Sequence, residues 1–398
     1  MPEPIKGPFH GRPLAFAIAI AAILLTAANL RGGIVVVGPL VADIRASLGL
    51  SASQFSMLTT LPLICFGLVS SLVPALTRRL EPPQLVIIAL LVISLGVALR
   101  MAPAFLLILL GTLLLGSAIA LLNVLIPGLV KGYFPNHPGI MTGLYTVTLG
   151  TGAGLGVYLA VPLRDIFDDW RVPLAVWALL PPLCILPWLY LLRVHTRTYQ
   201  PPQSRGPSLW RNGRAWAITG YMGLQSTFFY SIVTWLANLL TDSGLSDEHA
   251  GLATSLSNLA GIPAGLLTPL LATRFHDQRK LVLGIALLAI TGLAGLLLAP
   301  TQATLLWATL IGLSGGASLS LSLTLFALRT NTATEAFALS AMAQSVGYLI
   351  AAAGPLVIGA INDFNGSWFY AVVLLISLQV IQCLLGLVAG KPGTITGS

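Results

Sequence analysis

The sequence predicts an all-α integral membrane protein of twelve transmembrane helices, arranged as two six-helix halves. Of its 398 residues, 56% are apolar and 8% are charged, whereas a soluble domain carries about 25% charged residues. Twelve apolar runs reach or approach the roughly 20 residues that a helix needs to cross a bilayer. A repeat at an offset of 195 residues relates the two halves.

The twelve runs are separated by proline, glycine or charged residues, which end or interrupt apolar helices. The first run has no small-residue cleavage site after it, so it is expected to remain as a helix rather than to be removed as a signal peptide. In chain order the runs lie at 14–41, 52–76, 84–100, 104–130, 140–163, 173–192, 215–240, 250–272, 281–299, 304–328, 337–361 and 369–390.

The distribution of basic residues predicts that both termini lie in the cytoplasm. With the N-terminus inside, fifteen of the twenty basic residues fall in cytoplasmic segments, whereas eight of the twelve acidic residues fall outside. Such a bias sets the orientation of membrane helices, and it accounts for the net charge of +8 without a nucleic-acid partner. The four basic residues expected in outside loops are Arg45, Arg100, Arg164 and Arg171.

An internal repeat divides the chain. At an offset of 195 residues, Gly49-Leu50-Ser51 recurs as Gly244-Leu245-Ser246, and Arg79 recurs as Arg274. Duplicated halves of like orientation are typical of transporters in which the substrate binds near the bilayer midplane and access alternates between the two sides. The predicted domains are an N-terminal half at 1–192, a cytoplasmic linker at 193–214 and a C-terminal half at 215–398.

Arg31 is the one basic residue that this topology leaves inside an apolar run, and no acidic residue lies in the interior of any run to pair with it. An arginine at the centre of a membrane helix costs about 2.5–3.5 kcal/mol on insertion scales, so such a residue usually faces a cavity or a partner. Arg31 is therefore a candidate to bind an anionic or electronegative substrate through its planar guanidinium. The alternative is that it extends to the outer interface or caps backbone carbonyls. The equivalent position in the second half is Ser226, so the charge is not duplicated.

Other polar side chains in the runs could line the same cavity, although a structural interhelical hydrogen bond explains any one of them at least as well. Those nearest the middle of their runs are preferred. The further candidate substrate-binding residues are Asn29, Gln225, Gln344 and Tyr348, followed by Asn123, Tyr145, Tyr230 and Asn258.

No pattern in the sequence indicates an enzyme, a metal site or a cofactor. The five histidines lie in loops or tails, and the three cysteines lie inside apolar runs without the spacing of metal ligands. The glycine-rich segment 150–156 looks like a nucleotide loop, but it follows no strand and lies in an apolar helix. Its small residues, like those at 314–322, are expected to let a helix pack tightly against a neighbour.

Four stretches resemble the cyanate porter branch of the major facilitator superfamily, which contains CynX-type cyanate transporters and NimT-type nitroimidazole transporters. The stretches lie at 29–31, 58–62, 123–131 and 341–348. The resemblance implies the major facilitator fold and a multi-pass transporter of the bacterial inner membrane. Such a protein moves a small, planar, anionic or electron-rich solute by alternating access, and Arg31 stands at the position of a family arginine in helix 1.

The loop between the second and third runs departs from the superfamily, because 74–83 lacks the usual aspartate and glycines and the second-half copy has Thr273 at the aspartate position. The lack of a carboxylate inside the runs leaves proton coupling, uniport and exchange all open. The alternatives in function are a broad-specificity drug efflux pump, a passive channel and a non-transporting membrane sensor. The expected partners are membrane lipid and a small anionic or weak-acid substrate, and the expected state is a monomer.

Overall fold

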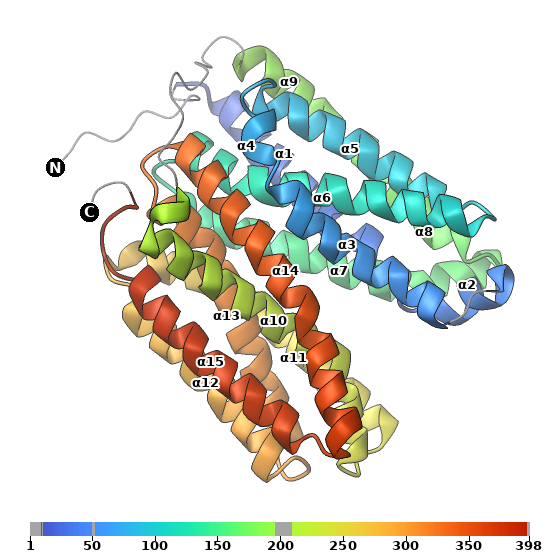
Figure 1. The fold of residues 1–398 in the computed structure, drawn as a ribbon. Coiled ribbons are helices and arrows are strands. Elements are labelled where there is room, and N and C mark those ends of the chain that lie inside the picture. The colour runs from blue at the N-terminus through green and yellow to red at the C-terminus, as the bar shows by residue number, and fades with distance from the viewer. Residues whose placement is uncertain (1–8, 10, 50–51, 196–208, 396–398) are drawn as a thin grey trace. The chain divides into compact units, whose positions relative to one another are not determined.

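The computed structural model describes residue 9 and residues 11–49, 52–195 and 209–395, and the regular structure in these ranges is helical (Figure 1). Contacts group the chain into two compact units. Unit 1 contains Met1–His137, Leu144–Gly206 and Thr332–Ala341, and unit 2 contains Pro138–Gly143, Pro207–Asn331 and Met342–Ser398. Most of the linker predicted at 193–214 lies outside the described residues.

The helices follow one another along the chain with short connections. The starts of α7 and α14 belong to the opposite unit from the rest of those helices. The helices up to the linker are α1 (Pro13–Val35), α2 (Val41–Leu48), α3 (Ala52–Ser70), α4 (Val73–Leu76), α5 (Pro82–Leu99), α6 (Phe105–Tyr133), α7 (Pro138–Phe167), α8 (Arg171–Leu183) and α9 (Ile185–His195). After the short 3-10 turn η1 (Leu209–Arg211) come α10 (Gly213–Asp242), α11 (Asp247–Arg274), α12 (Arg279–Leu298), α13 (Thr304–Leu328), α14 (Ala333–Asn365) and α15 (Phe369–Ala389).

Ten helical segments among the described residues are long and apolar enough to cross a membrane. They are α1, α5, α6, α7, α8 together with α9, and α11 to α15. The predicted run at 52–76 contains the 19-residue α3. The run at 215–240 forms the 30-residue α10. This helix is long enough to cross a membrane but is not among the ten, because it is less apolar. Its buried residues include the polar Gln225, Ser226 and Thr227.

Three predicted runs are interrupted. The run at 14–41 ends early, because α1 stops at Val35 and α2 begins only at Val41. The run at 52–76 is divided between α3 and α4. The run at 173–192 breaks at Cys184, two residues after the Pro181-Pro182 pair. Proline has no amide hydrogen, so it removes helical hydrogen bonds and favours such a break.

The side chain of Ser94 supplies one of the hydrogen bonds that the break at Cys184 removes. Pro182 cannot donate to the carbonyl of Ala178, four residues earlier, and that carbonyl instead accepts a hydrogen bond from the Ser94 hydroxyl of α5. Because α5 packs against both α8 and α9, the interruption of the helix is also a point of attachment between helices. Pairing of such freed carbonyls with neighbouring serines is what makes proline tolerable in membrane helices.

Arg100 was expected in an outside loop. It is the C-cap residue after α5, in the turn before α6, but it is buried there, with 2% of its surface exposed. Its Nη1 donates to the carbonyl of Gly33 at 2.5 Å. That carbonyl belongs to the last turn of α1, where carbonyls lack helical partners. Burial lowers the pKa of Arg100 to about 10, so the side chain stays charged at neutral pH and caps α1.

Glycines allow close helix crossings, as the sequence predicts for the segment 150–156. Gly152 of α7 lies against the backbone of Ala28 in α1, and one turn later Gly156 lies against Gly32. An added Cβ at Gly152 would overlap the Ala28 carbonyl. Close approach of backbones through small residues is a main source of helix association in membranes.

The same kind of packing joins α11 and α13 in unit 2. Gly312 lies against the backbone of Ser257, and Gly316 lies against Gly261. The expectation that the small residues around 314–322 serve packing is confirmed for this pair of helices. The buried face of α13 therefore has little space between it and α11 for a ligand.

The repeat is visible in the backbone. Gly49, after α2, has φ of 63°, and Gly244, after α10, has φ of 95°. These positive angles favour glycine over residues with a Cβ. The two glycines are the equivalent members of the Gly-Leu-Ser repeat, so both halves turn in the same way at this point.

Candidate functional site

Arg31 lies on α1, four residues before the helix ends at Val35. Its Cα is seven residues past the middle of this 23-residue helix at Leu24, which corresponds to roughly 10 Å at 1.5 Å per residue. It is therefore farther from the middle than the sequence suggests, because α1 ends before the predicted limit. The Cα–Cβ bonds of a helix tilt toward its N-terminus, so the Arg31 side chain is directed back toward the middle.

The surroundings of Arg31 come from α7 and α8. Arg31 is half-buried and lies near Tyr145 of α7, which is 2% exposed. The next residue, Gly32, contacts the indole of Trp177 on α8, and it also meets Gly156 of α7. The backbone that carries Arg31 is thus packed against two neighbouring helices, which limits the freedom of the guanidinium.

Asn29 points to the break between α8 and α9. Its Nδ2 donates to the Leu25 carbonyl at 2.8 Å and to the Cys184 Sγ at 3.2 Å, while its buried Oδ1 has no hydrogen-bond partner among the described residues. The atom left for a ligand is an acceptor, which suits an N–H group and not an anion. Asn123 is also buried, on α6, which packs against α1.

Unit 2 holds a separate group of predicted residues. Gln225 on α10 and Gln344 and Tyr348 on α14 lie within one helical turn of the crossing of these helices, and all three are buried. The Gln225 Oε1 accepts a hydrogen bond from the Ser226 hydroxyl at 3.1 Å. These three therefore lie on the same pair of crossing helices, and Ser226, the residue that takes the place of Arg31 in the repeat, lies on α10 beside Gln225.

Tyr230 and Asn258 are less buried than the other candidates of unit 2. Tyr230 is half-buried, five residues beyond Gln225 on α10, and its ring packs edge-on against Phe229. Asn258 is exposed on α11, and its Nδ2 donates to the Thr254 carbonyl of its own helix at 3.0 Å. One of the two amide hydrogens of Asn258 is thus already used.

Two buried glutamines of α15 are absent from the predicted set. Gln379 and Gln382 are each 3% exposed, and the Gln379 Nε2 donates to the Gln382 Oε1 at 3.0 Å. The sequence contains the signal, because these are the only amide side chains in the apolar run at 369–390. Buried polar groups in a membrane helix face other helices or a cavity, so both belong among the candidates.

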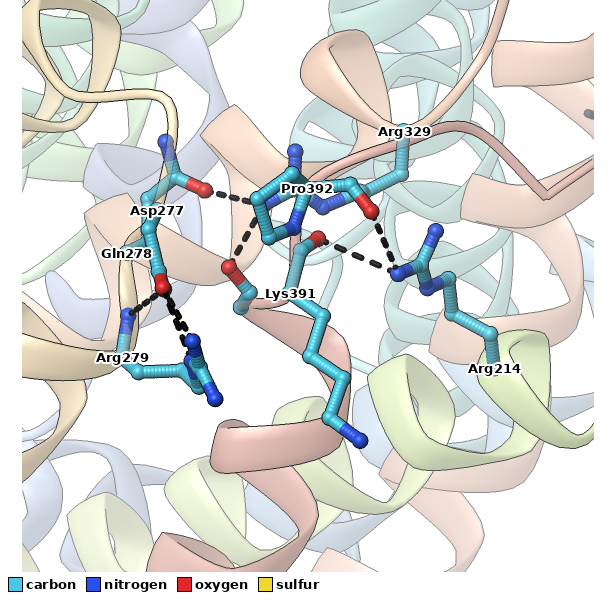
Figure 2. A network of polar contacts seen from close by, with 8 residues as sticks. Arg214, Asp277, Gln278, Arg279, Arg329, Lys391 and Pro392 are labelled. Atoms are coloured by element: carbon cyan, nitrogen blue, oxygen red, sulfur yellow. Dashed lines mark hydrogen bonds and ion pairs between the residues drawn. The ribbon is translucent and has the colours of Figure 1, made fainter. Parts of the chain in front are cut away.

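A basic cluster at the other end of unit 2 serves structure (Figure 2). Arg329, 4% exposed, donates to the carbonyls of Ala389 and Gly390 at 2.9 Å each and to the Gln278 Oε1. Burial, and then the nearby charge of Arg214, lower the pKa of Arg329 to about 10. The Arg329 guanidinium therefore donates its hydrogen bonds mainly to the carbonyls at the C-terminal end of α15.

On its exposed side, this cluster forms hydrogen bonds with the C-terminal segment that follows α15. Arg214 donates to the carbonyls of Lys391 and Pro392 at 3.2 and 2.8 Å, as Figure 2 shows. Asp277 pairs with Arg279, whose hydrogen bonds lower the pKa of Asp277 to about 2. Since the donors are taken by carbonyls and by this carboxylate, the cluster is a joint between α10, the loop before α12 and the end of α15.

Comparison with known proteins decides the family, because the model of the Major Facilitator Superfamily matches residues 14–355. The chain belongs to the Major Facilitator Superfamily. It is a multi-pass membrane transporter for a small-molecule substrate, and not an enzyme. It is 38% identical over 378 residues to the 2-nitroimidazole transporter of Escherichia coli (strain K12), covering 94% of this chain and 95% of that one.

A second relative agrees with this membership, and a solved structure shows the same fold. The cyanate transport protein CynX of Escherichia coli (strain K12) is 27% identical over 364 residues, which cover 90% of this chain and 94% of that one. These relatives confirm the cyanate porter branch that the sequence suggests. The superfamily proton:xylose symporter XylE, solved with 6-bromo-6-deoxy-D-glucose, has the same fold with a TM-score of 0.73, at 12% identity and over 94% of this chain and 95% of that one.

Proposed function

We propose that this transporter moves a small, planar, anionic or electron-rich solute, of the cyanate or nitroimidazole type, by alternating access. The observation that carries the proposal is the position of Arg31, a half-buried arginine in an apolar helix and near Tyr145. The relatives that transport 2-nitroimidazole and cyanate support the same class of solute.

The Gly33 carbonyl at the end of α1 is capped by Arg100, and Arg31 is the arginine proposed to bind the solute. A guanidinium is planar and offers a fixed fork of donors, which matches carboxylates, nitro groups and other flat acceptors with two oxygen atoms. Partial burial strengthens such a bond, because the local dielectric constant is lower than that of water.

The other candidate residues are proposed to contact different groups of the solute. In this proposal the unpartnered Oδ1 of Asn29 accepts from an azole N–H, and Arg31 donates to an anionic or nitro oxygen. Gln225, Gln344 and Tyr348 of unit 2 are proposed as further hydrogen-bonding residues for a solute. A cation is disfavoured, because it would be repelled by Arg31.

The proposal includes a membrane topology. The chain crosses the bacterial inner membrane twelve times, as two six-helix halves at 1–192 and 215–398 with both termini in the cytoplasm, and it acts as a monomer. The predicted charge bias supports this orientation. Coupling to protons through a membrane-embedded carboxylate has no candidate residue in the apolar runs, so a weak-acid solute would carry its own proton.

The experiment is ligand-induced thermal stabilisation of the purified protein in a nonionic detergent. The ligands are cyanate, nitrate, small carboxylates, 2-nitroimidazole and hydrophobic cations, and wild type is compared with Arg31→Ala. A ligand that binds only the folded state raises the unfolding temperature by mass action. We expect an anion or 2-nitroimidazole to stabilise wild type and not Arg31→Ala. Equal stabilisation of both proteins by cations alone would contradict the proposal.

A further inference from the structure

Unit 2 contains a cleft of about 540 Å³ that is separate from all residues discussed as substrate contacts. It lies where the C-terminal ends of α10, α12 and α14 meet the N-terminal end of α15, at the opposite end of these helices from the Arg329 cluster. Its volume is in the range of roughly 300–1,000 Å³ that is typical of small-molecule sites. In the predicted topology this end of unit 2 faces the outside.

The lining of the cleft combines polar and apolar residues. Of the described residues in its lining, Asp242 alone is charged, and the neutral polar groups include Asn362 and Ser367. Leu296 and Phe369 are among the apolar residues of the lining. An apolar wall with one carboxylate has the charge and shape complementarity for a monocation that carries an apolar group.

The carboxylate is held in place. The Asp242 Oδ2 accepts a hydrogen bond from the indole of Trp368 at 2.8 Å, which leaves Oδ1 for a second donor. Trp368 in turn packs against Trp235, with ring centroids 5.6 Å apart, and the Trp235 indole donates to the Pro355 carbonyl at 2.8 Å. The two indoles are fixed through their N–H groups, so the cleft is preformed.

An unpartnered hydroxyl lies beneath the cleft. A narrow crevice of about 10 Å³ shares Trp368 and Leu296 with the cleft and reaches Ser231. Ser231 is 1% exposed, and its Oγ has no hydrogen-bond partner among the described residues. A crevice of this size has room for about one water-sized group. The Ser231 hydroxyl is thus a buried polar group, in the crevice that adjoins the cleft, which no described residue satisfies.

We propose that this cleft binds an aryl-alkyl ammonium ion at the outer end of unit 2, with the ammonium on Asp242 and the ring against Leu296 and Phe369. The site is distinct from the anion site proposed at Arg31 and has the opposite charge preference. A bound ion connects the ends of α10, α12, α14 and α15, and it therefore stabilises this end of unit 2.

The test uses 2-phenylethylammonium chloride with the full-length protein in a nonionic detergent, and measures both affinity and unfolding temperature. The comparison ligands are 2-phenylethanol, which is neutral, and 3-phenylpropionate, which is an anion. Asp242→Asn keeps an oxygen for Trp368 and removes the charge. Asp168→Asn is the matched control, because Asp168 is an exposed residue with φ of 52°, a conformation that asparagine tolerates.

The ammonium ion is expected to bind wild type and Asp168→Asn alike, and to bind Asp242→Asn about ten-fold or more weakly. Asn362→Asp adds a second carboxylate to the lining and is expected to tighten binding, which keeps the proposal testable if Asp242→Asn does not fold. Equal binding of the ion by wild type and Asp242→Asn would overturn the proposal. Equal binding of 2-phenylethanol and the ion by wild type, or no change in Asn362→Asp, would also overturn it.

Discussion

Gly347 packs against Gly223 where α14 crosses α10, and an added Cβ at either glycine would come within 3.1 Å of the other residue. The positions 195 residues earlier are Gly152 and Ala28, which meet where α7 crosses α1. The two halves of the chain thus use the same helix crossing. On α1 and α7 the crossing holds the helices that carry Arg31 and Tyr145, and on α10 and α14 it lies beside Gln225 and Gln344.

The crossing at Gly152 predicts a strong effect of added volume. Gly152→Val is expected to destabilise the protein by about 1–3 kcal/mol or more, because the new side chain meets a backbone carbonyl that cannot rotate away. Thermal unfolding in detergent measures this. Gly154→Val on the same helix is the control, since its Cβ would meet nothing within 4 Å. Equal losses in the two variants would show that helix propensity, and not the crossing, sets the cost.

The break at Cys184 predicts a coupling between Ser94 and Pro182. Ser94→Ala is expected to cost about 1–3 kcal/mol, because the Ala178 carbonyl loses its donor. In a Pro182→Ala background the residue at 182 regains an amide hydrogen for that carbonyl, so the same change should cost less. A double-mutant cycle by thermal or denaturant unfolding measures the difference. Ser377→Ala, which removes an exposed hydroxyl, is the control. If the losses in unfolding free energy of Ser94→Ala and Pro182→Ala are strictly additive, Ser94 does not replace the hydrogen bond that Pro182 removes.

The basic cluster of unit 2 predicts unequal roles for two arginines. Arg329→Met is expected to destabilise the protein by about 1–3 kcal/mol, because the carbonyls after α15 lose a buried charged donor. Arg279→Met should have little effect, because its partner Asp277 is solvent-accessible. Unfolding temperature at moderate salt separates the two. If Arg279→Met is the more damaging change, the cluster is held by its ion pair rather than by the buried guanidinium.

Much of this architecture could be predicted from composition and repetition. Long apolar runs and the Gly-Leu-Ser repeat depend on local sequence, and the structure reproduces the corresponding helices and both glycine turns. The ends of the runs are less predictable, because Val36 and its neighbours are as apolar as the helix that precedes them. As a result Arg31 was expected nearer to the middle of α1 than it lies.

The contacts of the candidate residues depend on parts of the chain that are distant in sequence. Arg100 could not be told from an ordinary loop arginine, because its role depends on the Gly33 carbonyl, which is 67 residues away in sequence. Asn29 was correctly placed in the interior, but the direction of its amide depends on the break at Cys184. Gln379 and Gln382 were visible in the sequence and carried the same polar signal as Gln225.

The central claim is that Arg31 binds the substrate during transport, and substrate flux in proteoliposomes tests it most directly. Uptake of labelled 2-nitroimidazole and of cyanate is measured for wild type, Arg31→Gln and Arg12→Gln, the last being an exposed arginine at the start of the same helix. The account predicts that wild type and Arg12→Gln carry at least one of the two solutes. Arg31→Gln should carry it with an apparent affinity about 10- to 100-fold lower. Undiminished flux in Arg31→Gln would contradict the account.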